Sequence, residues 1–229
     1  MERARRGEAG RAARTAPIML RGDRAMRIGV LLGGCGLYDG SDVFETVLVI
    51  QALEGAGEKA LLLAPDRAQA RTVDHRTGEA MPGEERNVLR ESARLGRGRV
   101  QDLAGTSPDD VEAVIIPGGY GPAINLGRGF AEAGVARDLD PVVERFLRAC
   151  LLTRKPFGLV GLGEIPVRLL LAQEFEAPAP PPEPAALRVD EGNRIVFTPG
   201  YAVFTRLADV RAGIEAMVVK VIALIGSPA

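Results

Sequence analysis

Short apolar runs that end in glycine restrict the possible folds of this chain more than any other feature. Three of these runs are followed by the turns Gly33-Gly34-Cys35-Gly36, Gly118-Gly119 and Gly161-Leu162-Gly163. Such runs are typical of strands that are buried on both faces, and stretches with helical periodicity separate them. This alternation predicts one α/β domain with a mainly parallel sheet that is covered by helices on both sides.

The periodicity also predicts where the elements lie. We expect strands at 27–32, 59–64, 111–116 and 157–160, and helices at 42–53, 84–95, 139–151, from about 164, and at 205–225. Segments 187–190 and 194–198 suggest a hairpin, and 66–83 an irregular connection. Five prolines between Glu176 and Ala186 exclude a helix or a central strand there, so 176–186 is expected to be a surface loop.

Residues 1–25 differ in composition from the rest. They hold seven arginines against three acidic residues, a balance of +4, which leaves −5 for the remainder of a chain with net charge −1. The segment lacks the apolar stretch of a secretory signal, and its three acids argue against a mitochondrial targeting peptide. We therefore expect a disordered N-terminal extension at 1–25, a domain at 26–229, and a cytoplasmic location.

Charge and residue usage argue against several functions. A mildly acidic body, without basic stretches interleaved with aromatic residues, disfavours nucleic acid as a partner. No apolar run approaches the length of a membrane span. The two cysteines, Cys35 and Cys150, and the single His75 make a zinc site improbable, and we expect no metal and no cofactor. Cys150 falls on a helical apolar stripe, as a packed and inert thiol would.

Ligands of open parallel sheets lie beyond the carboxyl ends of the strands, where the glycine turns fall. The first turn is not a dinucleotide fingerprint, because Asp39 stands where a third glycine would be needed, and no P-loop is present. Glu45 follows in the first turn of a helix, either as a proton-exchanging carboxyl or as half of a capping box with Asp42. Cys35 is either a thiol activated by the helix N-terminus or a small packing residue.

The other two turns have alternatives too. Gly118-Gly119 could direct backbone amides at a developing oxyanion, or serve only as a strand exit. The third turn has the strand–turn–helix form of a nucleophile elbow, but Gly161 stands where Ser or Cys is needed. His75 lies in a polar loop, where a lone histidine more often faces solvent than takes part in catalysis.

Taken in order, these segments resemble the ElbB branch of the PfpI-type, class I glutamine amidotransferase-like superfamily. The matching pieces are Ile28–Ser41, Asp74–Met81, Arg86–Leu89, Ile116–Gly121, Asn125-Leu126, Lys155–Gly158 and Thr198–Tyr201. The resemblance covers about 26–172 and 188–225. It implies a flavodoxin-like three-layer sandwich, usually dimeric, whose members act on reactive aldehydes such as glyoxals. Relatives of this branch have been linked to isoprenoid metabolism.

The resemblance also implies site residues. Glu45 matches the partnering glutamate, Gly118 and Gly119 the oxyanion turn, and the family's elbow cysteine falls on Gly161. Cys35, a catalytic candidate with Glu45, and His75 match residues common in the branch. We expect Gly34, His75 and Asn125 to help to bind ligand. A second departure from the family is the stretch at 176–186, which replaces a longer piece of the relatives.

Two hypotheses follow, with a third at the level of the fold alone. The first is a protein that binds a small carbonyl or anionic metabolite, as a homodimer, without elbow-cysteine catalysis. The second is a glyoxalase- or deglycase-like enzyme that uses Cys35 with Glu45. The third, a nucleotide-binding regulator, has only fold-level support.

Overall fold

The structure, a computed structural model, describes residues 25–129, 137–172 and 183–227. The expected N-terminal extension at 1–25 therefore lies outside the described residues, apart from Ala25. Of the proline-rich stretch at 176–186 only the last four residues are described, and they form a bend and a turn.

A seven-stranded sheet forms the centre of the described chain, in the order β10-β11-β9-β6-β1-β2-β5. Neighbouring strands run parallel, except that β10 is antiparallel to β11. Strands β2, β1, β6, β9 and β11 stand in the order known from flavodoxin-like sheets. The strands are β1 (Arg27–Leu31), β2 (Lys59–Ala64), β5 (Gln101–Asp102), β6 (Ala113–Ile116), β9 (Phe157–Val160), β10 (Arg188–Asp190) and β11 (Ile195–Thr198).

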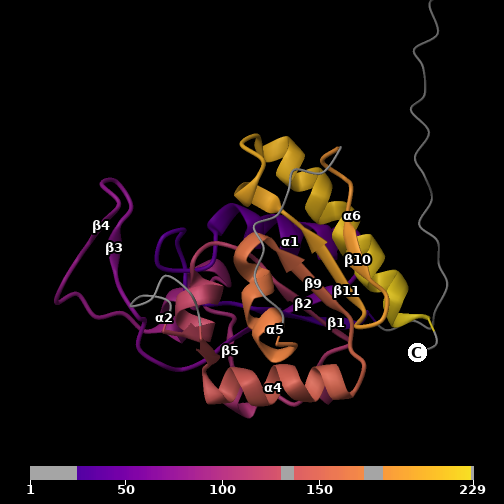
Figure 1. The fold of residues 1–229 in the computed structure, drawn as a ribbon, viewed down its shortest axis with the longest axis horizontal. Helices are drawn as coiled ribbons and strands as arrows, with labels where there is room; N and C mark the ends of the chain where they lie inside the picture. The colour runs from indigo at the N-terminus through magenta and orange to yellow at the C-terminus, as the bar shows by residue number, and fades with distance from the viewer. Residues whose placement is uncertain (1–24, 130–136, 173–182, 228–229) are drawn as a thin grey trace, which may run out of the picture.

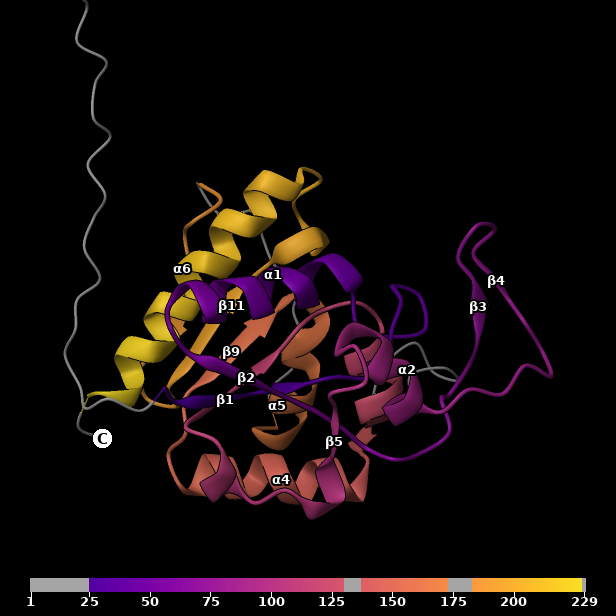
Figure 2. The same ribbon diagram turned by 180° about the vertical axis from the view of Figure 1, so that it is seen from behind.

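Helices cover both faces of this sheet (Figures 1 and 2). Helices α1, α2 and α6 pack on one face, and α4 and α5 on the other. Their bounds are α1 (Val43–Gly55), α2 (Val88–Leu95), α4 (Pro141–Leu152), α5 (Ile165–Leu170) and α6 (Leu207–Ile225). The predicted three-layer α/β sandwich with a mainly parallel sheet is therefore confirmed. Within the described residues, no helix combines the length and the apolar character that a membrane crossing requires.

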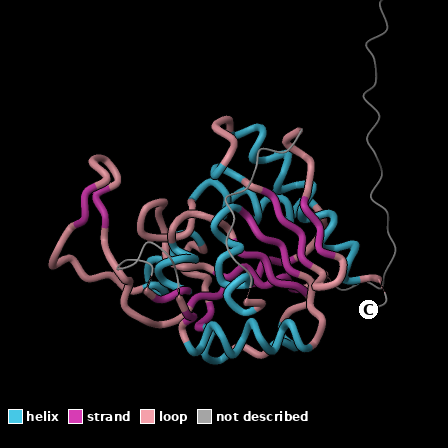
Figure 3. The backbone as a smooth tube through the Cα atoms, in the orientation of Figure 1, coloured by secondary structure: helices cyan, strands magenta, loops and turns pink. Residues whose placement is uncertain are grey.

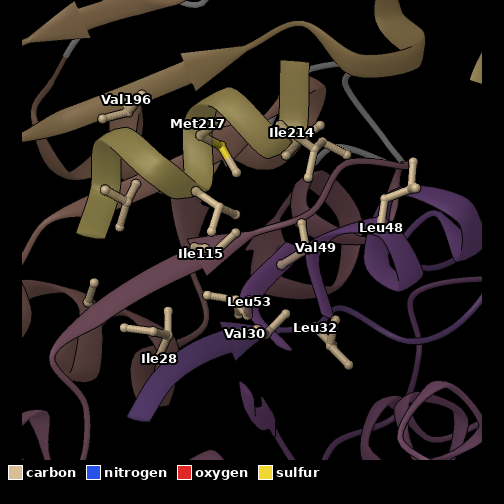
Figure 4. Close-up of a cluster of buried hydrophobic side chains, with 14 of the residues drawn as sticks. Ile28, Val30, Leu32, Leu48, Val49, Leu53, Ile115, Val196, Ile214 and Met217 are labelled. Atoms are coloured by element: carbon tan, nitrogen blue, oxygen red, sulfur yellow. The ribbon is translucent and has the colours of Figure 1, made fainter. Parts of the chain in front are cut away.

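The core consists of two aliphatic clusters, one on each face of the sheet. Alternate residues of β1 serve the two sides: Ile28 and Val30 belong to the cluster under α1 and α6, and Leu31 to the cluster over α4. Figure 4 shows the first cluster, in which Met217 of α6 and Val49 of α1 lie over Ile115 of β6. Strands buried on both sides explain why the apolar runs in the sequence are continuous rather than alternating.

Two features differ from the prediction, and Figure 3 shows which segments are helices, strands and loops. Helix α2 begins after Asn87 rather than at residue 84, because the Asn87 side chain caps it by accepting from the Arg90 N–H. The connection at 66–83 is not wholly irregular, since β3 (Val73–Asp74) pairs with β4 (Glu79–Ala80) in a projecting hairpin. Because the hairpin buries few side chains, its sequence does not alternate between apolar and polar residues.

Short elements complete the description. Strands β7 (Gly127–Arg128) and β8 (Asp138–Leu139) form a small antiparallel pair, and η3 (Pro122–Leu126) is one turn of π-helix. The 3₁₀ turns are η1 (Leu103–Gly105), η2 (Pro108–Asp110), η4 (Gly161–Glu164) and η5 (Gly200–Ala202). Of these, η4 and η5 follow β9 and β11 directly and belong to the site.

Candidate functional site

The three glycine turns meet beyond the carboxyl ends of β1, β6 and β9. Their backbones approach so closely that side chains would not fit between them. A Cβ built on Gly33 would lie 2.6 Å from the carbonyl carbon of Gly121, and one on Gly119 would lie 2.5 Å from the Gly40 oxygen. One on Gly163 would overlap the Ile116 oxygen. Glycine is therefore required where these turns pack together.

Glu45 lies at the centre of this arrangement. Its carboxylate is buried, at 2% exposure, and each oxygen accepts a backbone hydrogen bond: Oε2 from the Gly118 N–H and Oε1 from the Tyr201 N–H, both at 2.8 Å. Burial, and then the Asp42 carboxylate, raise the pKa of Glu45 from 4.5 to about 7, although the two N–H groups favour the charged form. Such a group can give or take a proton near neutral pH.

The capping box predicted for Asp42 and Glu45 forms only in part. The Asp42 side chain accepts from the Glu45 N–H at 2.9 Å, as an N-cap should. The returning bond is missing, since the Asp42 N–H donates to the Gly118 oxygen instead. The Glu45 carboxyl therefore points away from its own helix end and toward the glycine turns.

Gly161 begins η4 directly after β9, and its φ of +50° is the left-handed conformation expected of an elbow residue. A Cβ there would contact only the Pro199 oxygen at 3.2 Å and the Ala202 Cβ at 3.7 Å within 4 Å. The position is buried, and a side chain fits there only if the Pro199 oxygen shifts by a few tenths of an ångström. Glycine removes the cost of roughly 1–2 kcal/mol that an L-residue has in this conformation.

Val160 connects Gly161 with Glu45. Cβ atoms built on Gly118 and Gly200 would both overlap the Glu45 carboxylate and both approach Val160, the residue before the elbow. The structure therefore brings together three of the predicted residues: Glu45, Gly118 and Gly161. Gly119, with φ of +79°, is adjacent, and no hydrogen bond among the described residues uses its N–H. That N–H is the one in this turn still free to serve as an oxyanion donor.

Cys35 does not join this group. The charged side chains that act on its thiol are Glu91, Arg94, Asp39 and Arg86, on the side of α2, and Glu45 is not among them. Burial, and then Glu91, raise the pKa of the half-buried Cys35 thiol. The expectation that a nearby helix N-terminus lowers this pKa is therefore wrong, because desolvation and a neighbouring carboxylate outweigh it.

The Asn125 side chain links neighbouring loops by hydrogen bonds. The side chain is fully buried, donates to the Gly33 and Asp39 oxygens at 2.8 and 2.9 Å, and accepts from the Ala70 N–H at 2.9 Å. Gly34, with φ of +99°, donates its N–H to the Ser92 hydroxyl. These bonds hold the first turn in place and leave those atoms little capacity for a ligand.

His75 has a similar structural role. Its Nε2 accepts from the Leu37 N–H at 2.9 Å, and its Nδ1 lies 3.1 Å from the Val73 oxygen. The neighbouring Asp39 carboxylate is fully buried; Oδ2 accepts from the Val73 N–H, while Oδ1 lies 3.5 Å from His75 Nε2. The histidine thus ties the projecting hairpin to the first glycine turn.

Cys150 lies outside this site. Burial raises the pKa of Cys150 to about 12, and its side chain is fully buried on the inner face of α4, which confirms the packed thiol expected there. Within the described ranges, no group of three His, Cys, Asp or Glu side chains is arranged to hold a metal ion.

Tyr201 and Gly200 are site residues that the sequence analysis placed in a segment of the family resemblance but did not assign to the site. Tyr201 supplies one of the two N–H donors to Glu45, and Gly200, with φ of +54°, lets the chain pass against the carboxylate. The signal was present in the segment Thr198-Pro199-Gly200-Tyr201. A proline–glycine pair after a strand could have been compared with the other glycine turns.

Comparison with known proteins found relatives that extend over most of the chain, although no family model matches it. It is 34% identical to the human glutamine amidotransferase-like class 1 domain-containing protein 3, mitochondrial, over 88% of this chain and 84% of that protein. It is 33% identical to the rat ES1 protein homolog, mitochondrial, over 87% and 84%. These relatives are named as mitochondrial proteins, so the prediction of a cytoplasmic location is wrong.

A solved structure is similar as well. It is the crystal structure of an isoprenoid biosynthesis protein with amidotransferase-like domain from Ehrlichia chaffeensis, with a TM-score of 0.77 and 29% sequence identity. The match covers 86% of this chain and 99% of that chain. The arrangement of helices around the sheet is therefore shared along nearly the whole of the solved relative.

Proposed function

Since the chain belongs to the glutamine amidotransferase-like class 1 family that includes the ES1 proteins, we propose that it binds a small carbonyl or anionic metabolite without elbow-cysteine catalysis. The observation that carries this proposal is a buried Glu45, with a pKa of about 7, beside an elbow that has no side chain. A protonated Glu45 can donate to a ligand carbonyl. The Gly119 N–H can add a second donor.

The elbow of this chain has no nucleophile at the position that the resemblance assigns to one. A thiolate would add to the aldehyde carbon of methylglyoxal, and the resulting oxyanion would take a proton from Glu45. The hydrogen on that carbon would then move as a proton to the neighbouring carbonyl carbon, through an enediol, to give a lactoyl thioester, which water would hydrolyse to lactate and the free thiol. Gly161 has no thiol with which to form that bond. The alternative hypothesis, in which Cys35 serves with Glu45, has weaker support because the two residues lie in different surroundings.

Lactate formation from methylglyoxal tests this proposal. We expect no turnover by the natural protein or by Cys35→Ser, and measurable turnover by Gly161→Cys, because a thiol there would stand beside Glu45. A double variant with Glu45→Gln should lose that gained activity. Turnover by the natural protein that disappears in Cys35→Ser would instead establish the alternative.

Binding is tested separately with pyruvate, which is both a carbonyl compound and an anion. Calorimetry should detect saturable binding to the natural protein and weaker binding to Glu45→Gln. Absence of any pyruvate binding would count against the proposed site. The name of the solved relative points to isoprenoid biosynthesis, and we propose the same broad setting for this chain.

We further propose that the chain forms a homodimer through an apolar patch at the start of α1. Val43, Phe44 and Val47 are 41%, 57% and 51% exposed, and the Phe44 ring lies 6.3 Å from the Tyr201 ring. Exposed apolar side chains gathered on one helix are typical of protein contacts. Sedimentation should show a dimer that Phe44→Glu converts to monomer, while Leu152→Glu, on α4 of the opposite layer, stays dimeric. A monomeric natural protein would refute this proposal.

A further inference from the structure

A second polar site lies on the opposite face of the sheet, away from Glu45. The turn η4, helix α5 and strands β9, β10 and β11 line a partly open cavity of about 190 Å³. Part of its wall is apolar and comes from Leu159, Val167 and Phe197. The polar part is formed by the side chains of Glu164, Arg168 and Arg188.

Only one of the two oxygens of the Glu164 carboxylate in this wall accepts hydrogen bonds. It is 2% exposed, and its Oε2 accepts from Arg168 Nε and from Arg188 Nη2, both at 2.6 Å. Its Oε1 is buried and has no hydrogen-bond partner among the described residues. A buried acceptor without a donor is costly, so this oxygen favours a ligand that brings an N–H or O–H group.

Arg188 supplies the complementary group. Its guanidinium lies 4.1 Å from the centre of the Phe197 ring, and its side chain is half-exposed. A guanidinium carries five N–H donors in a fixed fork. Arg188 can therefore donate to a ligand carboxylate while it keeps its hydrogen bond to Glu164. The cavity wall therefore offers an acceptor and a donor for opposite charges.

The charges of the wall balance. Among the described residues, two arginines and two carboxylates, those of Glu164 and Asp190, line the cavity. The Asp190 carboxylate accepts from Asn193, which lowers its pKa and keeps it ionised. A ligand without net charge preserves this balance, whereas a simple anion or cation would leave one charge unmatched. The volume is below the roughly 300–1,000 Å³ typical of drug-sized ligands, so the ligand is small.

We propose that this cavity binds a small aliphatic α-amino acid. Its ammonium group donates to Glu164 Oε1 once the carboxyl turns this buried oxygen toward the cavity, its carboxylate accepts from Arg188, and its side chain packs against Val167 and Phe197. Leucine is the natural probe, because it carries both charges and a branched apolar side chain of suitable size. The cavity is lined by Glu164, the last residue of η4, but not by Glu45, Gly118 or Gly161, so different variants test the two sites.

Calorimetric titration of the full chain with leucine tests the proposal. We expect saturable binding, and about tenfold or greater loss of affinity for each of three analogues, since each lacks one interaction. 4-Methylpentanoate lacks the ammonium group, 3-methylbutylamine lacks the carboxylate, and glycine lacks the side chain. No binding of leucine, or binding of 4-methylpentanoate as tight as that of leucine, would overturn the proposal.

Variants locate the binding. Arg188→Leu should weaken leucine about tenfold or more and affect 3-methylbutylamine much less, because only leucine uses the guanidinium. Val167→Met should fill the apolar part and reduce leucine binding without removing any charge. Arg211→Leu is the matched control, because it removes an arginine of similar exposure from a surface ion pair on α6. Unchanged leucine affinity in both Arg188→Leu and Val167→Met would refute binding in this cavity.

Discussion

Replacing Gly163 by alanine will lower the free energy of unfolding by roughly 3 kcal/mol or more. The added Cβ would overlap the Ile116 oxygen and lie 3.0 Å from both the Ile116 carbonyl carbon and the Pro117 oxygen. These atoms belong to the backbone at the end of β6, and they cannot rotate away as a side chain could. To relieve the overlap, η4 would have to move away from the sheet.

Gly161→Ala provides the matched comparison, two residues earlier in the same turn. Its Cβ meets nothing closer than 3.2 Å, so the remaining cost is the left-handed backbone, about 1–2 kcal/mol. Urea unfolding of both variants against the natural protein measures the difference. Equal losses in the two variants would show that the packing of η4 against β6 is not as described.

The second large effect is a fall in stability as pH rises through the titration of Glu45. Its pKa is 4.5 when unperturbed and about 7 in the folded protein, so between these values the folded state holds more protons than the unfolded state. Stability associated with this carboxyl is complete below pH 4.5 and disappears as pH rises through 7. The change amounts to about 3 kcal/mol. Asp42, whose pKa is also raised by burial, acts in the same direction.

Unfolding free energies at a series of pH values check this for the natural protein and for Glu45→Gln. Glutamine does not titrate, so the variant should lose most of the slope above pH 5. Glu215→Gln removes an exposed carboxyl that pairs with Arg211 on α6, and it should keep the natural slope. If Glu45→Gln and the natural protein show the same slope, the carboxyl does not titrate as described.

The sequence predicted those parts of the molecule that depend on neighbours along the chain. Continuous apolar runs identified the central strands, and Asp42 followed by Glu45 located the start of α1, because burial on two faces and capping both leave local patterns. Gly118 and Gly161 were predicted as turn residues because each of them comes at the end of an apolar run. The resemblance then paired Glu45 with the elbow position.

Distant contacts were not predictable in this way. Burial of the Cys35 thiol in the folded chain, and then the Glu91 carboxylate on α2, more than fifty positions later, raise its pKa against the expected direction. Asn125 matched a position of the resemblance, but only the folded chain shows that its amide joins three loops. The hydrogen bonding of Glu164, in η4, likewise depends on Arg188, which belongs to β10.

The bond between Tyr201 and Glu45 has a consequence for how the protein is made. The two residues are 156 positions apart, and a chain is synthesised from its N-terminus. When α1 leaves the ribosome, Glu45 is an ordinary carboxyl in water, fully ionised at neutral pH. It acquires its second N–H donor and its full burial only when β11 and η5 have been added. The raised pKa of Glu45 thus arises only at the final stage of folding. A chain that stops before residue 200 would contain Glu45 but not its raised pKa.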